Sequence, residues 1–464
     1  MNEKYDVIVI GAGPGGYPCA IRLGQLGKKV LVIEAKELGG LCLNWGCIPT
    51  KALLYAAEMT DNFKKAKKMG FKLDIQGIDI EVLRTWKESV VKRLRSGVGF
   101  LFKANNVEWK HGFAKVISEH EVSVEKDDKK EVFQADNIVL ATGTEVTSLP
   151  GLEFDHKHLI DTDDALELAE VPETLLVIGA GASGLEMGTI YGRMGSKITV
   201  VELMEQILPG MESELCGSLH KMLQKNGMSI YTSSQVAGYT IKDNKCHVKI
   251  KQQDKEIEEI FDKILVTVGR KPFNTAFKDC GIETDNRGFI KVNEKLQTSI
   301  PNIYAIGDII GNPLLAHKAT KQGTTVAELL GGNNKHLVLG TIPSCVFTIP
   351  PLCSVGLTEK AAIDKGIKVK IGRSAYRSSG KALSMSEIEG IVKIIGDENG
   401  KLLGLHILGA ESSSLIGEGI LAIDKGMSVA DIAESIHPHP TLTEILHEAA
   451  ENFYGKAIHG VNRE

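Results

Sequence analysis

Two cysteines five positions apart, Cys42 and Cys47, offer the most specific chemistry in this chain. They lie in the segment GGLCLNWGCIPTK (residues 39–51), shortly after a glycine-rich dinucleotide-binding pattern. Two thiols so close along the chain can form an internal disulfide, and a nucleotide cofactor beside it could exchange two electrons with that disulfide. The segment therefore predicts an enzyme that moves electrons between a thiol substrate, a flavin and a nicotinamide.

The residues after Pro49 favour a helix, so both cysteines are expected near a helix beginning, where backbone N–H groups and the helix dipole lower a thiol pKa. Two other interpretations remain open. Half of a metal site would need a second close cysteine pair, and inert buried thiols would not need glycine-rich flanks. The other six cysteines show no partner spacing and are interpreted as core residues or incidental thiols: Cys19, Cys216, Cys246, Cys280, Cys345 and Cys353.

Two segments have the order strand, glycine-rich turn, helix, strand. The first runs from Tyr5 to Glu34 and the second from Leu175 to Glu202, and in both the acidic residue follows the first glycine by 23 positions. Such glycines permit a tight turn, let the backbone approach a pyrophosphate and let helix and strand pack closely, while the acidic residue binds a ribose. The glycines are Gly11, Gly13 and Gly16 in the first segment, and Gly179, Gly181 and Gly184 in the second.

The second segment also carries information about the nicotinamide cofactor. A carboxylate at Glu202 repels a 2′-phosphate, and no arginine follows in the sequence LMEQ (residues 203–206). The second site is therefore predicted to prefer NAD over NADP.

A histidine-rich segment near the C-terminus offers acid–base chemistry. A helix is expected after Pro440, with Glu444 near its first turn. A histidine–carboxylate pair in this segment can hold an imidazole in one tautomer and raise its basicity, which suits deprotonation of a dithiol. A structural histidine, or a metal cluster of His437, His439 and His447, are the alternatives.

Composition limits the remaining choices. A chain of 464 residues is too long for one ordinary core, so two to four domains are expected. The net charge of −5 is spread along the chain, which argues against a nucleic-acid partner. We expect no membrane span, and the chain enters a strand at Tyr5 without a leader, so we expect a cytoplasmic protein.

These motifs together resemble the disulfide-containing flavoprotein reductases, the class I pyridine nucleotide-disulfide oxidoreductase family, and within it the dihydrolipoamide dehydrogenases. The similarity covers essentially the whole chain. It rests on residues 39–51, both glycine-rich turns, ATG (141–143), AIGD (305–308), LAHKA (315–319), SVGLTE (354–359) and HPHPTLTE (437–444).

The resemblance implies an α/β fold with two Rossmann-like dinucleotide-binding domains and a C-terminal α+β dimerisation domain. It implies an FAD-binding domain over 1–145, an NAD-binding domain over 146–270, a central domain over 271–342 that completes the FAD site, and an interface domain over 343–464. FAD would contact Glu34 and the residues Lys51, Gly112, Thr142, Gly143, Asp308 and Ala316. NAD would contact Glu202, Val236 and Gly269. No metal is implied.

The resemblance also implies catalytic roles. Cys42 would exchange with the substrate, Cys47 would face the flavin, and Lys51 and Glu186 would form an ion pair beside it. The activity implied is oxidation of protein-bound dihydrolipoamide with NAD⁺.

His439, oriented by Glu444, would be the general base, and in the family it reaches the active site of the other subunit. A homodimer is therefore implied, with a lipoyl-bearing protein of a 2-oxoacid dehydrogenase, acetoin or glycine cleavage system as partner. Leu41 and Trp45 depart from the Thr and Val usual in relatives, so Trp45 could change access to the disulfide or its redox potential.

The main alternative is another disulfide reductase of the same family. An enzyme like glutathione reductase would need basic residues after the second ribose carboxylate, where this chain has Glu202 without them. A binding subunit that keeps FAD without turnover is the alternative from a different class.

Overall fold

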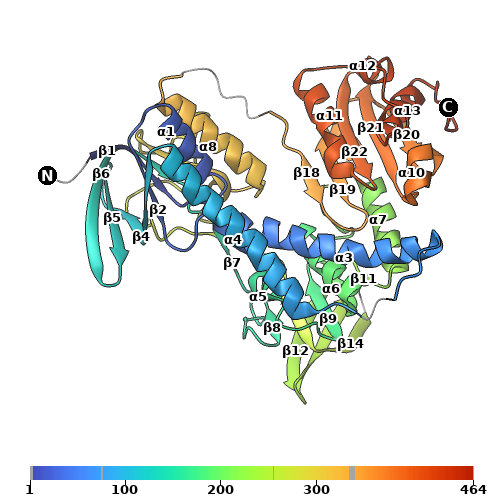
Figure 1. Cartoon of the computed structure of the whole chain (residues 1–464), viewed down its shortest axis with the longest axis horizontal. Coiled ribbons are helices and arrows are strands. Elements are labelled where there is room, and N and C mark those ends of the chain that lie inside the picture. Colours follow the sequence, from blue (N-terminus) through green and yellow to red (C-terminus); the bar gives the residue numbers. More distant parts are fainter. Residues whose placement is uncertain (1–3, 75–76, 254, 334–339, 463–464) are drawn as a thin grey trace.

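The computed structural model describes residues 4–74, 77–253, 255–333 and 340–462. The chain forms three lobes, each built around a sheet (Figure 1). Two long helices, α3 (Cys47–Lys68) and α4 (Ile80–Ala104), cross between the lobes and pack against each other. The predicted α/β class is confirmed. In the part of the chain described, no helix combines the length and apolar character needed to cross a bilayer.

The first lobe holds a seven-stranded sheet in the order β3-β2-β1-β6-β5-β4, with β17 also paired to β6. Its central strand, VIVI in sequence, is buried because parallel neighbours flank it and helices cover the sheet. Helices α1 (Gly16–Gln25) and α8 (Ala316–Leu330) pack together beside it. The strands are β1 (Lys4–Ile10), β2 (Val30–Glu34), β3 (Val107–His111), β4 (Phe113–Val116), β5 (Glu121–Lys126), β6 (Lys129–Leu140) and β17 (Ile303–Ala305).

The second lobe holds a parallel sheet in the order β11-β10-β9-β15-β8, with a three-stranded antiparallel sheet beside it. The parallel strands are β8 (Leu159–Ile160), β9 (Thr174–Ile178), β10 (Lys197–Val201), β11 (Ser229–Tyr231) and β15 (Lys263–Val266), and the antiparallel ones β12 (Ser234–Lys242), β13 (Lys245–Gln252) and β14 (Lys255–Phe261). The helices are α5 (Thr162–Glu167), α6 (Ala182–Met194) and α7 (Ser213–Lys225). A small ribbon of β7 (Thr144–Val146) and β16 (Arg270–Pro272) links the first two lobes along the chain.

The C-terminal lobe is a five-stranded antiparallel sheet in the order β18-β19-β22-β21-β20, as expected for an α+β domain. The strands are β18 (Ser344–Val346), β19 (Leu352–Gly356), β20 (Val369–Ala375), β21 (Ile391–Asp397) and β22 (Leu402–Leu408). The helices are α9 (Glu359–Asp364), α10 (Gly380–Met385), α11 (Ser412–Asp424), α12 (Val429–Ala433) and α13 (Glu444–Phe453). Of the short 3-10 turns, η1 (Gly307–Ile310) follows β17 of the first lobe, and η2 (Tyr376–Ser378) follows β20 of the C-terminal lobe. The bounds of the four domains stay predictions.

Candidate functional site

Cys42 and Cys47 form a disulfide, with their Cα atoms 4.6 Å apart. Cys42 lies in the short helix α2 (Gly40–Trp45), and Cys47 is the first residue of α3. The first backbone N–H groups of α3 have no partner within the helix, and its dipole adds partial positive charge at this end. The structure thus places one sulfur of the disulfide where a thiolate would be stabilised once the bond is reduced.

The disulfide segment packs directly on the first glycine-rich turn. The N–H of Gly39 donates to the carbonyl of Ala12 at 2.9 Å. Gly40 has φ +59°, and a Cβ there would lie 2.6 Å from the Cα of Gly13. Only glycine fits this close approach, so the thiol pair and the predicted dinucleotide site form one continuous surface.

The first turn has the shape that a dinucleotide requires. Gly11 has φ +101°, and a Cβ on Gly16 would lie 1.8 Å from the Gly11 carbonyl oxygen. The buried carboxylate of Glu34, at the end of β2, accepts hydrogen bonds from the N–H groups of Ala12 at 2.7 Å and Lys36 at 2.8 Å. The residues present therefore fit the cradle and ribose-binding position for FAD.

The second turn repeats this construction. Gly179 has φ +102°, and a Cβ on Gly184 would lie 2.0 Å from the Gly179 carbonyl oxygen. Glu202, directly after β10, accepts from the N–H groups of Ala180 at 2.7 Å and Met204 at 2.9 Å. The internal repeat expected from the sequence is thus present down to its hydrogen bonds, and this site fits a second dinucleotide.

Other predicted flavin contacts come together at the carboxyl edge of the first sheet. Gly112 follows β3, Thr142 and Gly143 follow β6, Asp308 follows β17 in η1, and Ala316 begins α8. This edge is where α/β sheets bind their ligands. Burial raises the pKa of Asp308, while positive charges nearby counteract that effect.

The predicted NAD contacts gather at the same edge of the second sheet. The loop with Gly269 follows β15, and the beginning of β12 lies beside Glu202, whose carbonyl accepts from Ser234 N–H at 2.9 Å. Val236 lies in β12, at a bulge in its pairing with β13. Gly181 is the residue before α6.

Lys51 and Glu186 form the expected ion pair, with Nζ 2.7 Å from Oε2. Lys51 lies one turn after Cys47 on α3, and Glu186 lies on α6 with only 5% of its surface exposed. Glu186 also accepts from the backbone N–H of Phe347 at 2.9 Å, and the Phe347 ring lies 4.3 Å from the Lys51 ammonium. Sequence reasoning missed Phe347, because a backbone donor leaves no signal in residue type.

The histidine–carboxylate pair is formed at the beginning of α13. His439 Nδ1 lies 2.8 Å from Glu444 Oε1, and the N–H of Thr441 donates to the other carboxylate oxygen at 2.9 Å. Burial raises the pKa of Glu444, but the hydrogen bonds from His439 and Thr441 together outweigh burial and lower the pKa overall. The carboxylate is thus held ionised, as a hydrogen-bond acceptor that fixes the imidazole.

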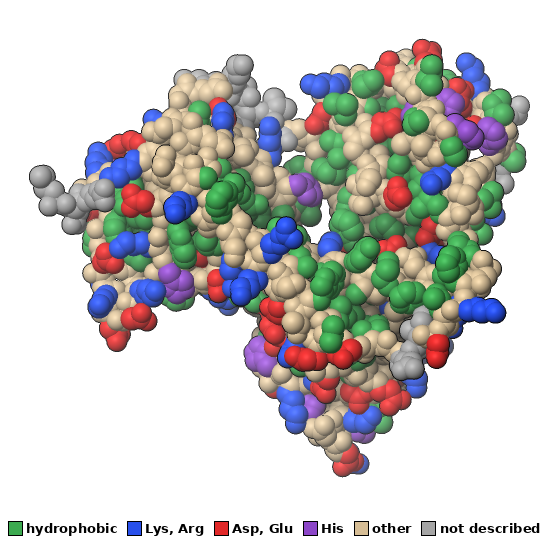
Figure 2. Space-filling view, viewed as in Figure 1, with side chains coloured by type: hydrophobic (Ala, Val, Ile, Leu, Met, Phe, Trp, Pro, Cys, Tyr) green, Lys and Arg blue, Asp and Glu red, His purple; other side chains and the backbone are tan. Residues whose placement is uncertain are grey.

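The imidazole of His439 is 79% exposed. Figure 2 shows histidine side chains gathered on the surface of the C-terminal lobe, next to α13. Within the described residues, no hydrogen bond or ion pair links His439 to the disulfide segment. One chain therefore leaves this pair open to solvent, available to a second copy.

The two departures from the usual redox motif lie on α2. Trp45 ends the helix, and the ammonium of Lys36 lies 5.5 Å from its ring centroid in a cation–π contact. Leu41 is partly exposed. Neither side chain replaces a reacting group.

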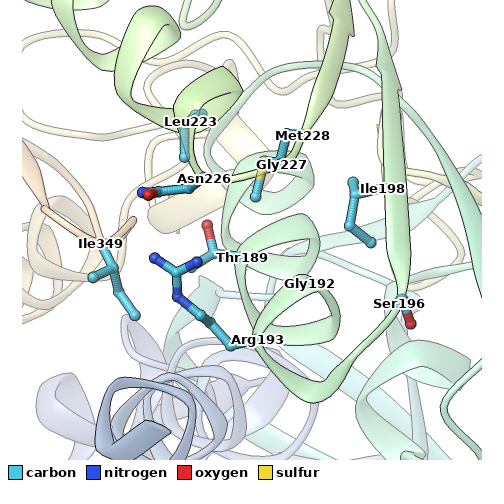
Figure 3. A pocket seen from close by; sticks show the side chains of 10 residues that line it. All are labelled: Thr189, Gly192, Arg193, Ser196, Ile198, Leu223, Asn226, Gly227, Met228 and Ile349. Atoms are coloured by element: carbon cyan, nitrogen blue, oxygen red, sulfur yellow. The ribbon is translucent and has the colours of Figure 1, made fainter. Parts of the chain in front are cut away.

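A separate cavity of about 30 Å³ lies between α6, the end of α7 and Ile349 (Figure 3). Thr189, Arg193 and Asn226 line it, and Arg193 pairs with Asp61 of α3 at 2.6 Å. The volume suits about two water molecules. None of the lining residues belongs to the predicted sites.

Comparisons with known proteins agree with this geometry. Residues 5–323 match the family described as pyridine nucleotide-disulphide oxidoreductase, and residues 342–450 match the dimerisation domain of that family, which supports a homodimer. The chain is 45% identical to a dihydrolipoyl dehydrogenase of Thermus scotoductus, covering 99% of this chain and 100% of the relative. It is 39% identical to the enzyme of the same name from Geobacillus stearothermophilus, covering 99% and 98%.

A solved structure shows the same fold. The Cu(II) complex of the HOCl-induced flavoprotein disulfide reductase RclA from Escherichia coli superposes with a TM-score of 0.86 at 25% identity, covering 97% of this chain and 99% of that one. Two glycine-rich turns of equal construction, a disulfide packed on the first of them and these full-length relatives lead to one conclusion. The chain belongs to the pyridine nucleotide-disulphide oxidoreductase family, as a relative of the dihydrolipoyl dehydrogenases.

Proposed function

We propose that this chain is a dihydrolipoyl dehydrogenase, which oxidises protein-bound dihydrolipoamide to lipoamide with FAD as cofactor and NAD⁺ as acceptor. The observation that carries the proposal is the Cys42–Cys47 disulfide, seated on the first dinucleotide turn with Lys51 one helical turn away. Full-length similarity to enzymes of that name supports the choice of substrate.

The substrate half-reaction follows from thiol chemistry. His439 accepts a proton from one dihydrolipoamide thiol, and the thiolate attacks the Cys42 sulfur. The Cys42–Cys47 bond breaks, a mixed disulfide forms, and Cys47 leaves as a thiolate. The second substrate thiolate then displaces Cys42, so lipoamide is released oxidised and the cysteine pair holds the two electrons.

The return half-reaction needs the cofactors. Bound FAD supplies two-electron chemistry between the reduced cysteine pair and NAD⁺. Lys51, fixed by Glu186, holds a positive charge close to Cys47, and the helix end adds to it. Both features favour Cys47 as the thiolate and Cys42 as the thiol that meets the substrate.

The nicotinamide site is proposed to take NAD in preference to NADP. Both oxygens of Glu202 already accept backbone N–H groups, which fixes the carboxylate where a 2′-phosphate would otherwise approach. A comparison of NADH and NADPH in steady-state kinetics tests this. Equal kcat/KM values for the two would contradict it.

The site is proposed to be completed by a second copy of the chain, whose His439–Glu444 pair would serve as the base. The exposure of His439 supports this arrangement. The partner would be a lipoyl-bearing protein of a 2-oxoacid dehydrogenase, acetoin or glycine cleavage system in the cytoplasm.

The test is NADH oxidation with lipoamide and glutathione disulfide as parallel acceptors, and ferricyanide as a control for flavin reduction alone. We expect a clear preference for lipoamide. A preference for glutathione disulfide would favour an enzyme like glutathione reductase. If only ferricyanide is reduced, the Cys42–Cys47 disulfide has no part in the reaction.

A further inference from the structure

Two cysteines outside the redox motif, Cys345 and Cys353, face each other in the C-terminal sheet. They are direct partners in the antiparallel pairing of β18 with β19. Such partners have Cβ atoms about 4.5–5.5 Å apart, close to the ~3.5–4.5 Å of a disulfide. Both are free thiols in this structure. Their spacing along the chain gave no sign of this, because the strand pairing alone brings them together.

The two thiols differ in environment. Cys353 is fully buried, and the Ser412 hydroxyl lies 3.4 Å from its sulfur. Interaction with Cys345 and burial raise the pKa of Cys353, so it stays a thiol. Cys345 is partly exposed, and hydrogen bonding with Cys353 lowers the pKa of Cys345, with help from the positive charge of Lys51 and against the effect of burial.

The pair also borders the redox site. Cys345 lies two residues before Phe347, whose backbone N–H holds Glu186 and whose ring lies under the Lys51 ammonium. We propose that Cys345 and Cys353 form a second oxidisable dithiol, which closes to a cross-strand disulfide when the protein meets a peroxide. A partly exposed cysteine beside a second, resolving cysteine is the arrangement found in redox-sensing pairs.

The reaction balances as follows. The Cys345 thiolate attacks one peroxide oxygen, and the O–O bond breaks. The hydroxide that departs takes up one proton and leaves as water, and Cys345 becomes a sulfenic acid. The Cys353 sulfur then attacks the Cys345 sulfur, and the S–O bond breaks. The hydroxide that departs takes up the Cys353 thiol proton and leaves as a second water. Two thiols lose two electrons to hydrogen peroxide, and an external dithiol can restore them by exchange.

Mass spectrometry of the FAD-loaded protein tests this directly. No lysine or arginine lies between the two cysteines, so one tryptic peptide carries both. After treatment with hydrogen peroxide, unfolding and alkylation, we expect this peptide to lose two hydrogens and to resist alkylation until dithiothreitol is added. Cys280, partly exposed and with a pKa raised by burial, is an internal benchmark. We expect Cys345 to react about tenfold faster.

Two variants separate the roles. Cys353→Ser should leave a sulfenic acid on Cys345 that dimedone captures, whereas Cys345→Ser should leave Cys353 free for alkylation after unfolding. The proposal is overturned if both cysteines of the unmodified sequence are still alkylated once Cys280 is oxidised, or if Cys353 is the one that dimedone captures. Flavin absorbance checks that each variant is folded. If a variant is not folded, the measurement on the unmodified sequence is sufficient to decide.

Discussion

The direction of attack on the disulfide follows from the positions of its two sulfurs. Cys47 begins α3, and the ammonium of Lys51 lies one turn further along the same helix. In thiol–disulfide exchange the better leaving thiolate is the one with the lower pKa. We therefore predict that the substrate attacks Cys42 and expels Cys47 as the thiolate.

Substitution of His439, a single residue, tests its proposed role as the base that deprotonates the substrate. His439→Gln keeps the size of the side chain but removes the proton acceptor, so we expect dihydrolipoamide oxidation to fall about a hundred- to ten-thousand-fold. NADH oxidation by ferricyanide should stay near its original rate, because it needs no substrate thiol to be deprotonated. Stopped-flow and steady-state rates measure both. Retention of lipoamide activity would assign the base to another residue.

Individual residues were predictable where their chemistry depends on residue type. The cysteine pair, the glycines of both turns and the acidic residues that follow are encoded by side chains, and the structure brings them together as expected. Phe347 and the Cys345–Cys353 pair were not predictable. A backbone hydrogen bond and a cross-strand pairing depend on which strands become neighbours, and local sequence does not contain that information.

At the scale of helices and strands, a buried ion cluster joins the second lobe to the C-terminal lobe. Lys393 on β21 is 1% exposed, and its ammonium contacts Glu359 at 2.6 Å, Glu212 at 2.7 Å and Glu214 at 2.9 Å. Glu212 and Glu214 lie at the beginning of α7, in the other lobe. The cluster thus fixes the C-terminal sheet against the second dinucleotide domain.

Lys393→Met is expected to destabilise the fold strongly. The methionine fills similar space but leaves the three carboxylates without their shared cation, and breaking such a buried pair costs about 3–5 kcal/mol. Urea unfolding at neutral pH measures the loss. Lys360→Met, which removes an exposed pair with Asp364, is the matched control and should change stability by about 0–1 kcal/mol. Equal effects of the two substitutions would contradict the role of the cluster.

The same cluster predicts a pH dependence. Burial raises the pKa of Glu212, but hydrogen bonds from Lys393 and the Glu359 N–H lower it overall from its usual 4.5. A carboxylate with a lowered pKa stabilises the fold above its unfolded value and loses that contribution as pH falls through the folded one. The stability difference between the original protein and Lys393→Met should therefore be present at neutral pH and shrink below about 4.5. Urea midpoints across this range measure it.

Periodicity and turn residues predicted helices and strands better than they predicted contacts between distant segments. The helix expected from the residues after Pro49 is present as α3, which begins at Cys47, and both strand–turn–helix–strand units are present. Pairing between distant segments was beyond local sequence. The join of β17 to β6, and the ion cluster of Lys393, both connect residues far apart along the chain.

At the scale of the whole molecule, a site shared between subunits can be tested with hybrid dimers. In a dimer of one Cys42→Ser chain and one His439→Gln chain, a shared arrangement leaves one site with both an intact disulfide and an intact base. Isolated hybrids should then show about half of the original lipoamide activity. If each base serves its own chain, both sites are damaged and the hybrid is inactive. Differently tagged chains allow the hybrid to be purified.

The central claim is that the Cys42–Cys47 disulfide exchanges electrons with the nicotinamide through FAD, so that NADH can also reduce the disulfide. Anaerobic addition of NADH to the FAD-loaded protein, followed by alkylation, digestion and mass spectrometry, tests it most directly. We expect the tryptic peptide that ends at Lys51 to carry two alkyl groups after NADH and none before. If that peptide still holds an intact disulfide after the flavin has been bleached by NADH, the disulfide does not take part in the reaction.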